Sequence, residues 1–322
     1  MNDATPNRLT GSLVERAART WDLAPPPLAY QAPKRVAPAA PAAPSEPVAS
    51  VASVAPVAAP FGPVTAPAAA PISRARRSRH PVVAIDRAGL RDHGLIVPGT
   101  AITALAEEFR LVKRNLLTTA REIADAGKAR AILVCSAQPD EGKTFCAINL
   151  ALSLAAERDV EVLLVDADFA KADVFDTLGV TVDAPGVLDA IADPSIDVED
   201  GIVDTDVPHL SLLGAGKRSN DDTELLSSAH AAEVLRRLTT ANPNRIVVFD
   251  SPPALAASPA AVLAQHVGQT MLVVRADSTS ESDLREAVTL LGACDHIGLV
   301  LNSVVFQPGG RRFGYYGQEG AE

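Results

Sequence analysis

The chain has 322 residues, of which 47% are hydrophobic and only 4% aromatic, and its formal net charge is −10 at pH 7. This length accommodates one large α/β domain with appendages, and the acidic balance argues against a general nucleic-acid-binding protein. The three cysteines, Cys135, Cys146 and Cys294, have no metal-binding or disulfide spacing, so we interpret them as small buried thiols in a reducing compartment.

The first segment, residues 1–22, is predicted to form a short amphipathic helix. Ser12 can cap it, and apolar residues between Leu13 and Trp21 repeat at helical spacing. A helix this short is marginal on its own in water. The segment is therefore either a docking helix that orders against a partner or a frayed tail, and the sequence leaves both open.

Residues 23–80 are predicted to form a disordered linker. Proline recurs among alanine, valine and serine over residues 23–72, and because proline fixes φ and lacks an N–H group, such a stretch is an extended tether. The linker ends in the basic run SRARRSRH, residues 73–80. This run can contact anionic lipid headgroups, but a solvated charged stretch is the simpler interpretation.

Residues 81–306 are predicted to form an α/β domain of the P-loop type with a doubly wound, mostly parallel sheet. Residues 102–117 form its first expected helix, because Leu105, Phe109 and Leu116 recur at helical spacing. From residue 131 onward, apolar β-branched segments alternate with helical ones, which places functional sites at the carboxyl ends of the strands. The expected strands are 131–136, 160–166, 210–215, 245–250, 270–276 and 297–304, and the further helices are 143–157, 222–240, 257–265 and 281–292.

The stretch SAQPDEGKTF, residues 136–145, has the context of a phosphate-binding loop because it follows a strand and opens a helix. Lys143 supplies a charge for the β- and γ-phosphates, and Thr144 supplies a hydroxyl for Mg²⁺. Ala137 stands where the usual pattern has its first glycine, and the Asp140 carboxylate is expected to point to solvent and to weaken phosphate binding somewhat. The predicted nucleotide-binding residues are Ala137, Gln138, Pro139, Asp140, Glu141, Gly142, Lys143, Thr144 and Phe145.

Three aspartates follow buried strands of the predicted sheet. Asp166 and Asp168 are two positions apart, so they are expected to face the same edge. Asp250 ends another strand in the motif DSPP and is suited to hold Mg²⁺. We predict that Thr144, Asp166 and Asp250 bind the metal, and that Lys143, Asp166 and Asp168 are catalytic, with one of the two aspartates as the general base.

The C-terminal segment, residues 307–322, is a glycine-rich tail that contains Tyr315 and Tyr316. A flexible tail cannot pack these aromatic rings into a core. We therefore predict that they are phosphoacceptors, although a pair of tyrosines without a role is the alternative.

Together these motifs resemble those of the bacterial tyrosine kinases (BY-kinases) of capsule and exopolysaccharide systems, most closely the exosortase-associated variety. The similarity covers about residues 102–306 and the N-terminal segment SLVERAA. The family patterns PGEGK[ST] and NLA match residues 139–144 and 149–151, DxD matches Asp166 and Asp168, DSPP matches Asp250 to Pro253, and ELL matches residues 224–226. Asp140 replaces the usual glycine of the first pattern.

The resemblance implies a protein-tyrosine autokinase that uses ATP and Mg²⁺ and phosphorylates its C-terminal tyrosines in trans within a homo-oligomeric ring. The oligomerisation motif ExxRxxR of the family matches Glu107, Arg110 and Lys113, with lysine at its last position, and Asn302 matches an adenine-side asparagine of related ATPases. The implied partner is an inner-membrane polysaccharide co-polymerase, a Wzz-like chain-length regulator, and a cognate tyrosine phosphatase is compatible with the family.

No apolar run reaches the about 20 residues that span a bilayer, and no signal-peptide pattern is present. We therefore expect a cytoplasmic protein that is attached peripherally to the inner membrane through a partner.

Two other functions remain open. A positioning ATPase of the ParA/MinD type has the same fold, but it places a signature lysine early in the loop, where this chain has Gln138. The other is a non-catalytic, nucleotide-binding scaffold of the polysaccharide assembly machinery.

Overall fold

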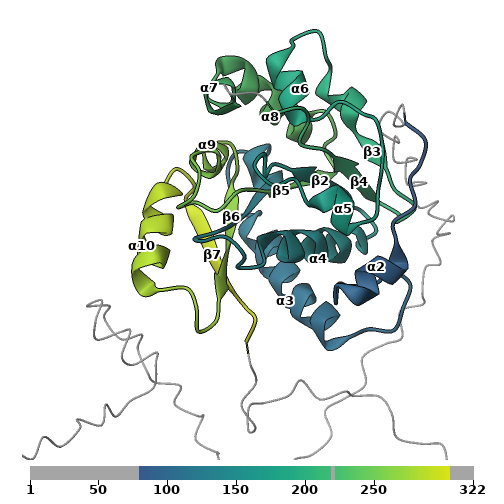
Figure 1. Cartoon of the computed structure of the whole chain (residues 1–322), viewed down its shortest axis with the longest axis vertical. Coiled ribbons are helices and arrows are strands. Elements are labelled where there is room, and N and C mark those ends of the chain that lie inside the picture. The colour runs from purple at the N-terminus through teal and green to yellow at the C-terminus, as the bar shows by residue number, and fades with distance from the viewer. Residues whose placement is uncertain (1–79, 219–221, 305–322) are drawn as a thin grey trace, which may run out of the picture. The chain divides into compact units, whose positions relative to one another are not determined.

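The computed structural model describes residues 80–218 and 222–304, which form a central sheet with helices on both faces (Figure 1). The predicted N-terminal helix, nearly all of the linker and the tyrosine-bearing tail lie outside the described residues, and the domain boundaries stay predictions. Among the described residues, none of the helices has the length and apolar character needed to cross a membrane.

The sheet has seven strands in the order β3-β4-β2-β5-β1-β6-β7. Neighbouring strands pair in parallel, except that β3 runs antiparallel to β4. The strands are β1 (Ala131–Ser136), β2 (Glu161–Asp166), β3 (Val203–Asp204), β4 (Leu210–Leu213), β5 (Arg245–Asp250), β6 (Gln269–Arg275) and β7 (His296–Asn302). The predicted α/β class and the six predicted strands are confirmed, and β3 was missed because two residues are too few to form a pattern.

The helices mostly follow the predicted segments, with one clear error. The helix predicted over 222–240 is two helices, because Ser228 begins a new one by accepting a hydrogen bond from the N–H of Ala231 at 3.0 Å. The short helices α2, α5 and α6 were not predicted. The helices are α2 (Arg87–Asp92), α3 (Ala104–Thr119), α4 (Lys143–Ala155), α5 (Val174–Thr177), α6 (Val187–Ala192), α7 (Asp222–Leu226), α8 (Ala229–Thr240), α9 (Pro259–Ala264) and α10 (Glu281–Leu290), with 3₁₀ turns at Lys128–Arg130 and Val198–Gly201.

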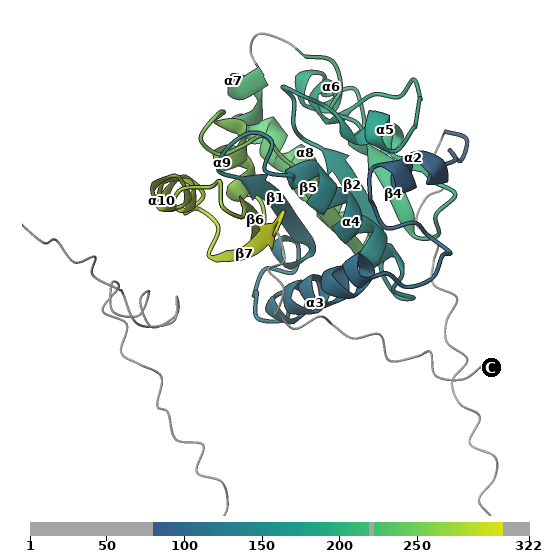
Figure 2. The same cartoon turned by 60° about the horizontal axis from the view of Figure 1, so that its bottom comes forward.

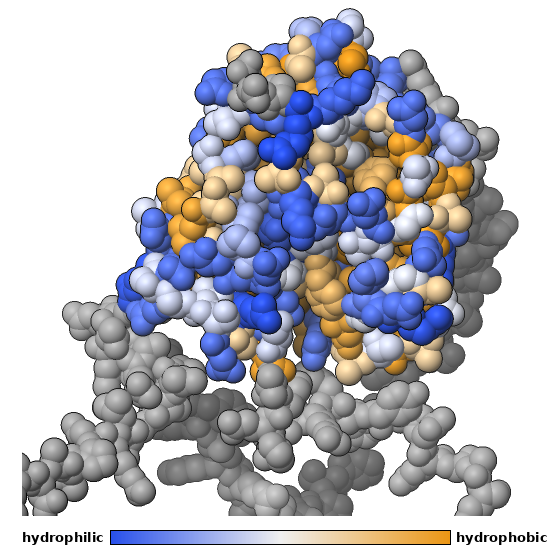
Figure 3. Space-filling model, viewed as in Figure 1, coloured by the Kyte–Doolittle hydropathy of each residue, from blue (hydrophilic) through white to orange (hydrophobic). Residues whose placement is uncertain are grey.

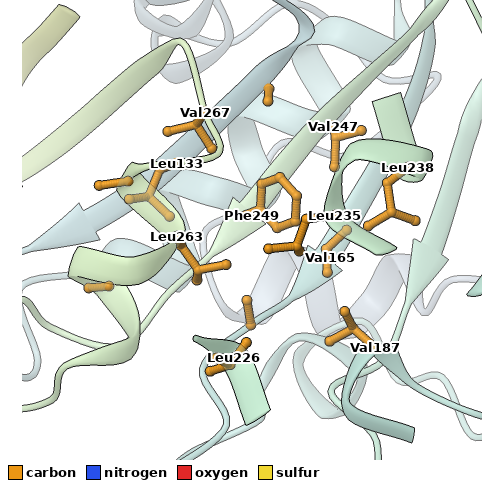
Figure 4. Close-up of a cluster of buried hydrophobic side chains, with 14 of the residues drawn as sticks. Leu133, Val165, Val187, Leu226, Leu235, Leu238, Val247, Phe249, Leu263 and Val267 are labelled. Carbon is orange, nitrogen blue, oxygen red and sulfur yellow. The ribbon is translucent and has the colours of Figure 1, made fainter. Parts of the chain in front are cut away.

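A hydrophobic core lies on each face of the sheet. On one face, α3 and α4 cover the sheet, as seen in Figures 1 and 2. Their apolar side chains form one buried cluster with the even-numbered residues Ile132 and Val134 of β1. On the other face, α8, α9 and α10 cover the odd-numbered ones. Phe249 of β5 lies in the middle of this second core, beside Val165, Leu235 and Val247 (Figure 4). The strands at the centre of the sheet are therefore buried on both faces.

The last strand, β7, differs from the prediction of a buried strand. It lies at the edge of the sheet, and the side chains of Leu299 and Leu301 are 57% and 60% exposed. Figure 3 shows one face of the molecule, on which hydrophilic residues are spread widely and hydrophobic ones form separate patches between them. An apolar run alone therefore did not distinguish a central strand from an edge strand.

Substitution of the central phenylalanine tests the importance of the second core. Phe249→Ala should lower the free energy of unfolding by about 3–5 kcal/mol, because it removes a fully buried ring and leaves a cavity. Leu301→Ala, at an exposed position, should change it by less than about 0.5 kcal/mol. Urea denaturation of the two variants measures both values, and similar losses would contradict this picture of the core.

Candidate active site

The loop between β1 and α4 ends at Gly142, in a backbone conformation that favours glycine. Gly142 has φ of 91°, and a Cβ atom there would lie 2.2 Å from the side-chain nitrogen of Asn302. The amides of the first turn of α4, which begins at Lys143, have no acceptor within the helix and carry partial positive charge. The loop and the helix together form a site suited to an anion such as a phosphate.

Asp140, the residue that departs from the family pattern, also adopts a left-handed backbone. Its φ is 60°, and it is exposed. Aspartate tolerates this region better than most residues with a side chain, although glycine does so without strain. The aspartate is therefore accommodated by the fold, at a cost in backbone strain that glycine would avoid.

The ammonium group of Lys143 forms an ion pair with the carboxylate of Asp168. The two atoms are 2.9 Å apart, and the side chains are 12% and 3% exposed. Asp168 also accepts a hydrogen bond from the N–H of Lys171 at 3.1 Å. The structure thus brings together two residues that were predicted separately, one for phosphate and one for the tyrosine hydroxyl.

The carboxyl groups of Asp166 and Asp168 do lie near each other, as predicted, because the charge of Asp168 contributes to the raised pKa of Asp166. Strand alternation is not the reason, because β2 ends at Asp166 and Asp168 lies beyond it. Asp166 instead lies opposite Asp250 in the parallel register of β2 and β5. One Asp166 oxygen accepts a hydrogen bond from the N–H of Val174 at 3.1 Å. The other Asp166 oxygen and both oxygens of Asp250 are buried without a hydrogen-bond partner of normal geometry among the described residues.

The burial of these two carboxyl groups alters their protonation. Burial raises the pKa of Asp166 to about 8, and the nearby charge of Asp250 adds to the effect. Burial also raises the pKa of Asp250, to about 7, although the neighbouring Thr144 hydroxyl and the Lys143 ammonium group lower it in part. Two carboxylates at adjacent strand ends are thus held where their charge is poorly compensated.

A divalent cation would fit this position. Buried carboxylate oxygens without partners are the ligands that Mg²⁺ prefers, and the cation would compensate their charge. The described residues contain no group of three or more His, Cys, Asp or Glu side chains that could hold a metal alone. Such a site matches the usual Mg²⁺ arrangement, in which one or two carboxylates are completed by phosphate oxygens.

The other predicted loop residues form a connected set. The N–H of Gln138 donates to the carboxylate of Glu141 at 2.9 Å, and the amide of Asn302 donates to the carbonyl of Glu141 at 2.9 Å. Thr279 and Arg275 also contact the loop, and the sequence analysis missed both. They lie more than a hundred residues from it in the chain, and no motif marks them.

The predicted oligomerisation residues on α3 do not share one environment. Glu107 and Arg110 form an exposed pair at 2.5 Å. Lys113 is buried, donates to the carbonyl of Ser153 at 2.9 Å and pairs with Glu157 at 2.6 Å. Lys113 therefore links α3 to the end of α4 within the chain, while a role of all three in oligomerisation stays a prediction.

No family model matches the chain. It is 28% identical over 215 residues to the tyrosine-protein kinase YwqD of Bacillus subtilis. The aligned region covers 66% of this chain and 86% of YwqD. It is 26% identical to the putative tyrosine-protein kinase CapB of Staphylococcus aureus, over 67% of this chain and 92% of that one. Among solved structures, the BceF tyrosine kinase domain has a TM-score of 0.51 and 27% identity, over 60% of this chain and 76% of that one. The resemblance to bacterial tyrosine kinases that the motifs indicated is confirmed, while similarity to the exosortase-associated variety stays a prediction.

The raised pKa values of the two aspartates predict how stability depends on pH. The folded state retains protons that the unfolded state releases near pH 3.8, so this contribution to stability is lost as pH rises towards the folded pKa values of about 7 and about 8. The free energy of unfolding of the protein without nucleotide and Mg²⁺ should therefore fall between about pH 5 and about pH 8.5. Urea denaturation across this range measures the slope.

Replacing Asp250 with a neutral residue should remove much of this fall in the free energy of unfolding. Asp250→Asn should raise the free energy of unfolding at pH 8 by about 4 kcal/mol and flatten the pH dependence. Asp295→Asn, at an exposed position, is the matched control and should leave the slope unchanged. A slope that is unaltered in Asp250→Asn would contradict the assignment.

Proposed function

We propose that this chain, a relative of the bacterial tyrosine kinases, is an ATP-dependent protein-tyrosine autokinase of exopolysaccharide or capsule biosynthesis and export. The observation that carries the proposal is the arrangement of Lys143 at the start of α4, in an ion pair with Asp168. Asp166 and Asp250 end the adjacent strands β2 and β5. The tyrosine-protein kinases among its relatives support the same chemistry.

In this proposal the phosphates of ATP lie against residues 137–145, with Lys143 neutralising their charge. When bound, Mg²⁺ would supply positive charge that offsets the charge developing on the phosphate groups during transfer. Thr144 and Asp250 would hold the metal, with Asp166 supporting it, because these residues offer a hydroxyl and buried carboxylate oxygens. An adenine-side role for Asn302 rests on the resemblance alone, and in the structure its amide donates to the carbonyl of Glu141 in the loop.

The transferred group passes from ATP to a tyrosine hydroxyl. The phenol oxygen bonds to the γ-phosphorus as the bond to ADP breaks, and the phenol proton passes to a carboxylate, for which Asp168 and Asp166 are the candidates. Asp168 is held by Lys143 and by the N–H of Lys171, so its position is fixed. Most of the rate gain should come from positioning and charge neutralisation.

The proposed acceptors are Tyr315 and Tyr316 of a neighbouring copy in a homo-oligomeric ring. Glu107 and Arg110, which are exposed on α3, are proposed ring contacts, and Lys113 supports that helix from within the chain. The proposed activator is an inner-membrane polysaccharide co-polymerase, through which the chain would associate with the membrane. The family resemblance supports these assignments.

The kinase proposal is tested by incubation of the purified chain with ATP and Mg²⁺ and detection of phosphotyrosine. We expect a signal that is lost in Lys143→Met and in the double variant Tyr315→Phe/Tyr316→Phe, because the first lacks the phosphate-neutralising charge and the second lacks the acceptors. Hydrolysis of ATP without phosphotyrosine would support a positioning ATPase instead. Nucleotide binding with neither activity would support a scaffold.

Phosphorylation in trans is tested by mixing two full-length variants, one that lacks the catalytic lysine and one that lacks the acceptor tyrosines. Lys143→Met retains the tyrosines, and Tyr315→Phe/Tyr316→Phe retains the catalytic residues, so neither should be phosphorylated alone. When they are mixed, we expect phosphotyrosine on the Lys143→Met chain, identified by a mass tag. A mixture that stays unphosphorylated, while the unsubstituted chain is active, would indicate transfer within one chain.

A further inference from the structure

The two halves of the phosphate loop are held in different ways. The carbonyl groups of Ser136 and Ala137 in its first half accept backbone N–H groups of Ala254 and Leu255 at 2.8 and 3.2 Å. The second half, from Gln138 to Glu141, is held by side chains, through Glu141, Asn302 and Arg275. The conformation of the second half therefore depends on a few individual side chains.

Glu141 is the centre of this second set of contacts. Only 3% of it is exposed, and its carboxylate accepts hydrogen bonds from the N–H of Gln138 and from the hydroxyl of Thr279. A buried carboxylate is costly unless its oxygens are hydrogen-bonded. These two donors therefore fix the carboxylate and, through it, the turn between Gln138 and Glu141.

Thr279 connects this carboxylate to the end of β6. Its hydroxyl accepts the backbone N–H of Arg275 at 2.9 Å and donates to Glu141. The guanidinium group of Arg275 donates to the carbonyl of Asp140 at 3.1 Å, and Asn302, at the end of β7, donates to the next carbonyl at 2.9 Å. Three residues from the β6–β7 end of the sheet thus converge on two consecutive loop residues, Asp140 and Glu141.

We propose that Thr279 is a positioning residue for the nucleotide site and acts through Glu141. It keeps the turn from Gln138 to Glu141 in the conformation that leads into the amino end of α4, where the proposed phosphate site lies. The loop has a particular need for such support, because Asp140 adopts a left-handed φ of 60° without being glycine. Support from Thr279 offsets the strain that this backbone carries.

This inference rests on the proposed nucleotide site and predicts an effect on affinity. If the hydroxyl of Thr279 is removed, the loop occupies its binding form for a smaller fraction of the time, and the apparent dissociation constant rises in inverse proportion to that fraction. A lost hydrogen bond to a charged group corresponds to a rise of about tenfold or more. Thr279 lies in a partly exposed bend, so the variant should still fold, although the buried Glu141 carboxylate loses one of its two donors.

The test measures Mg²⁺–ADP binding to the full chain by calorimetry. Thr279→Val keeps the shape but lacks the hydroxyl, and its Kd should rise about tenfold. Thr279→Ser keeps the hydroxyl and should bind within about threefold of the unsubstituted chain. Thr289→Val is the matched control, because Thr289 of α10 donates to the carbonyl of Arg285, away from the loop, and its Kd should not change.

A second variant separates positioning from a general loss of structure. Glu141→Gln should also weaken binding, and the double variant with Thr279→Val should be little weaker than either single one, because both remove the same link. Independent, multiplying effects on Kd would overturn the proposal, as would a Thr279→Val chain that binds normally. If the unsubstituted chain binds no ADP, the proposed function fails and this role with it. If the unsubstituted chain binds ADP and Thr279→Val binds it equally well, only the role of Thr279 is overturned and the proposed function stands.

Discussion

The site depends on the parallel pairing of the three central strands β2, β5 and β1. Parallel strands end at the same edge of a sheet, so this pairing places Asp166, Asp250 and the loop after β1 side by side. The register of β2 and β5 sets Asp166 directly opposite Asp250. Helix α4 then begins at that edge and directs its amino end at the same place. A change of register by one residue would separate the carboxyl groups and turn one of them to the other face.

The same arrangement imposes a cost on the folded state. Two carboxyl groups are buried at neighbouring strand ends, and three of their four oxygens have no partner of normal geometry among the described residues. Burial therefore raises the pKa of both. Natural proteins keep such uncompensated groups chiefly where a ligand uses them. The two hydrophobic cores, each covered by helices, supply stability that offsets this cost.

The sequence was sufficient for features that depend on neighbouring residues. The apolar strands, the helix after Lys143 and the strand-terminal Asp250 follow from local patterns. The contacts of Lys143 with Asp168, of Lys113 with Ser153 and of Glu141 with Thr279 do not, because they join residues far apart in the chain. The exposure of β7 was also missed, since its apolar run resembles that of a central strand. Thr279 and Arg275, which no sequence motif marks, are therefore identified as loop contacts only from the fold.

The end of β7 connects these observations. Asn302, its last residue, donates to the carbonyl of Glu141, so the strand that leads to the C-terminal segment touches the phosphate loop. Its side-chain nitrogen also occupies the space that any Cβ at position 142 would need. The backbone angle thus favours glycine at position 142, and a larger residue there would also have to displace the Asn302 side chain from its hydrogen bond with Glu141. Any substitution that moves the Glu141 carbonyl would therefore also break the hydrogen bond that it accepts from the last residue of β7.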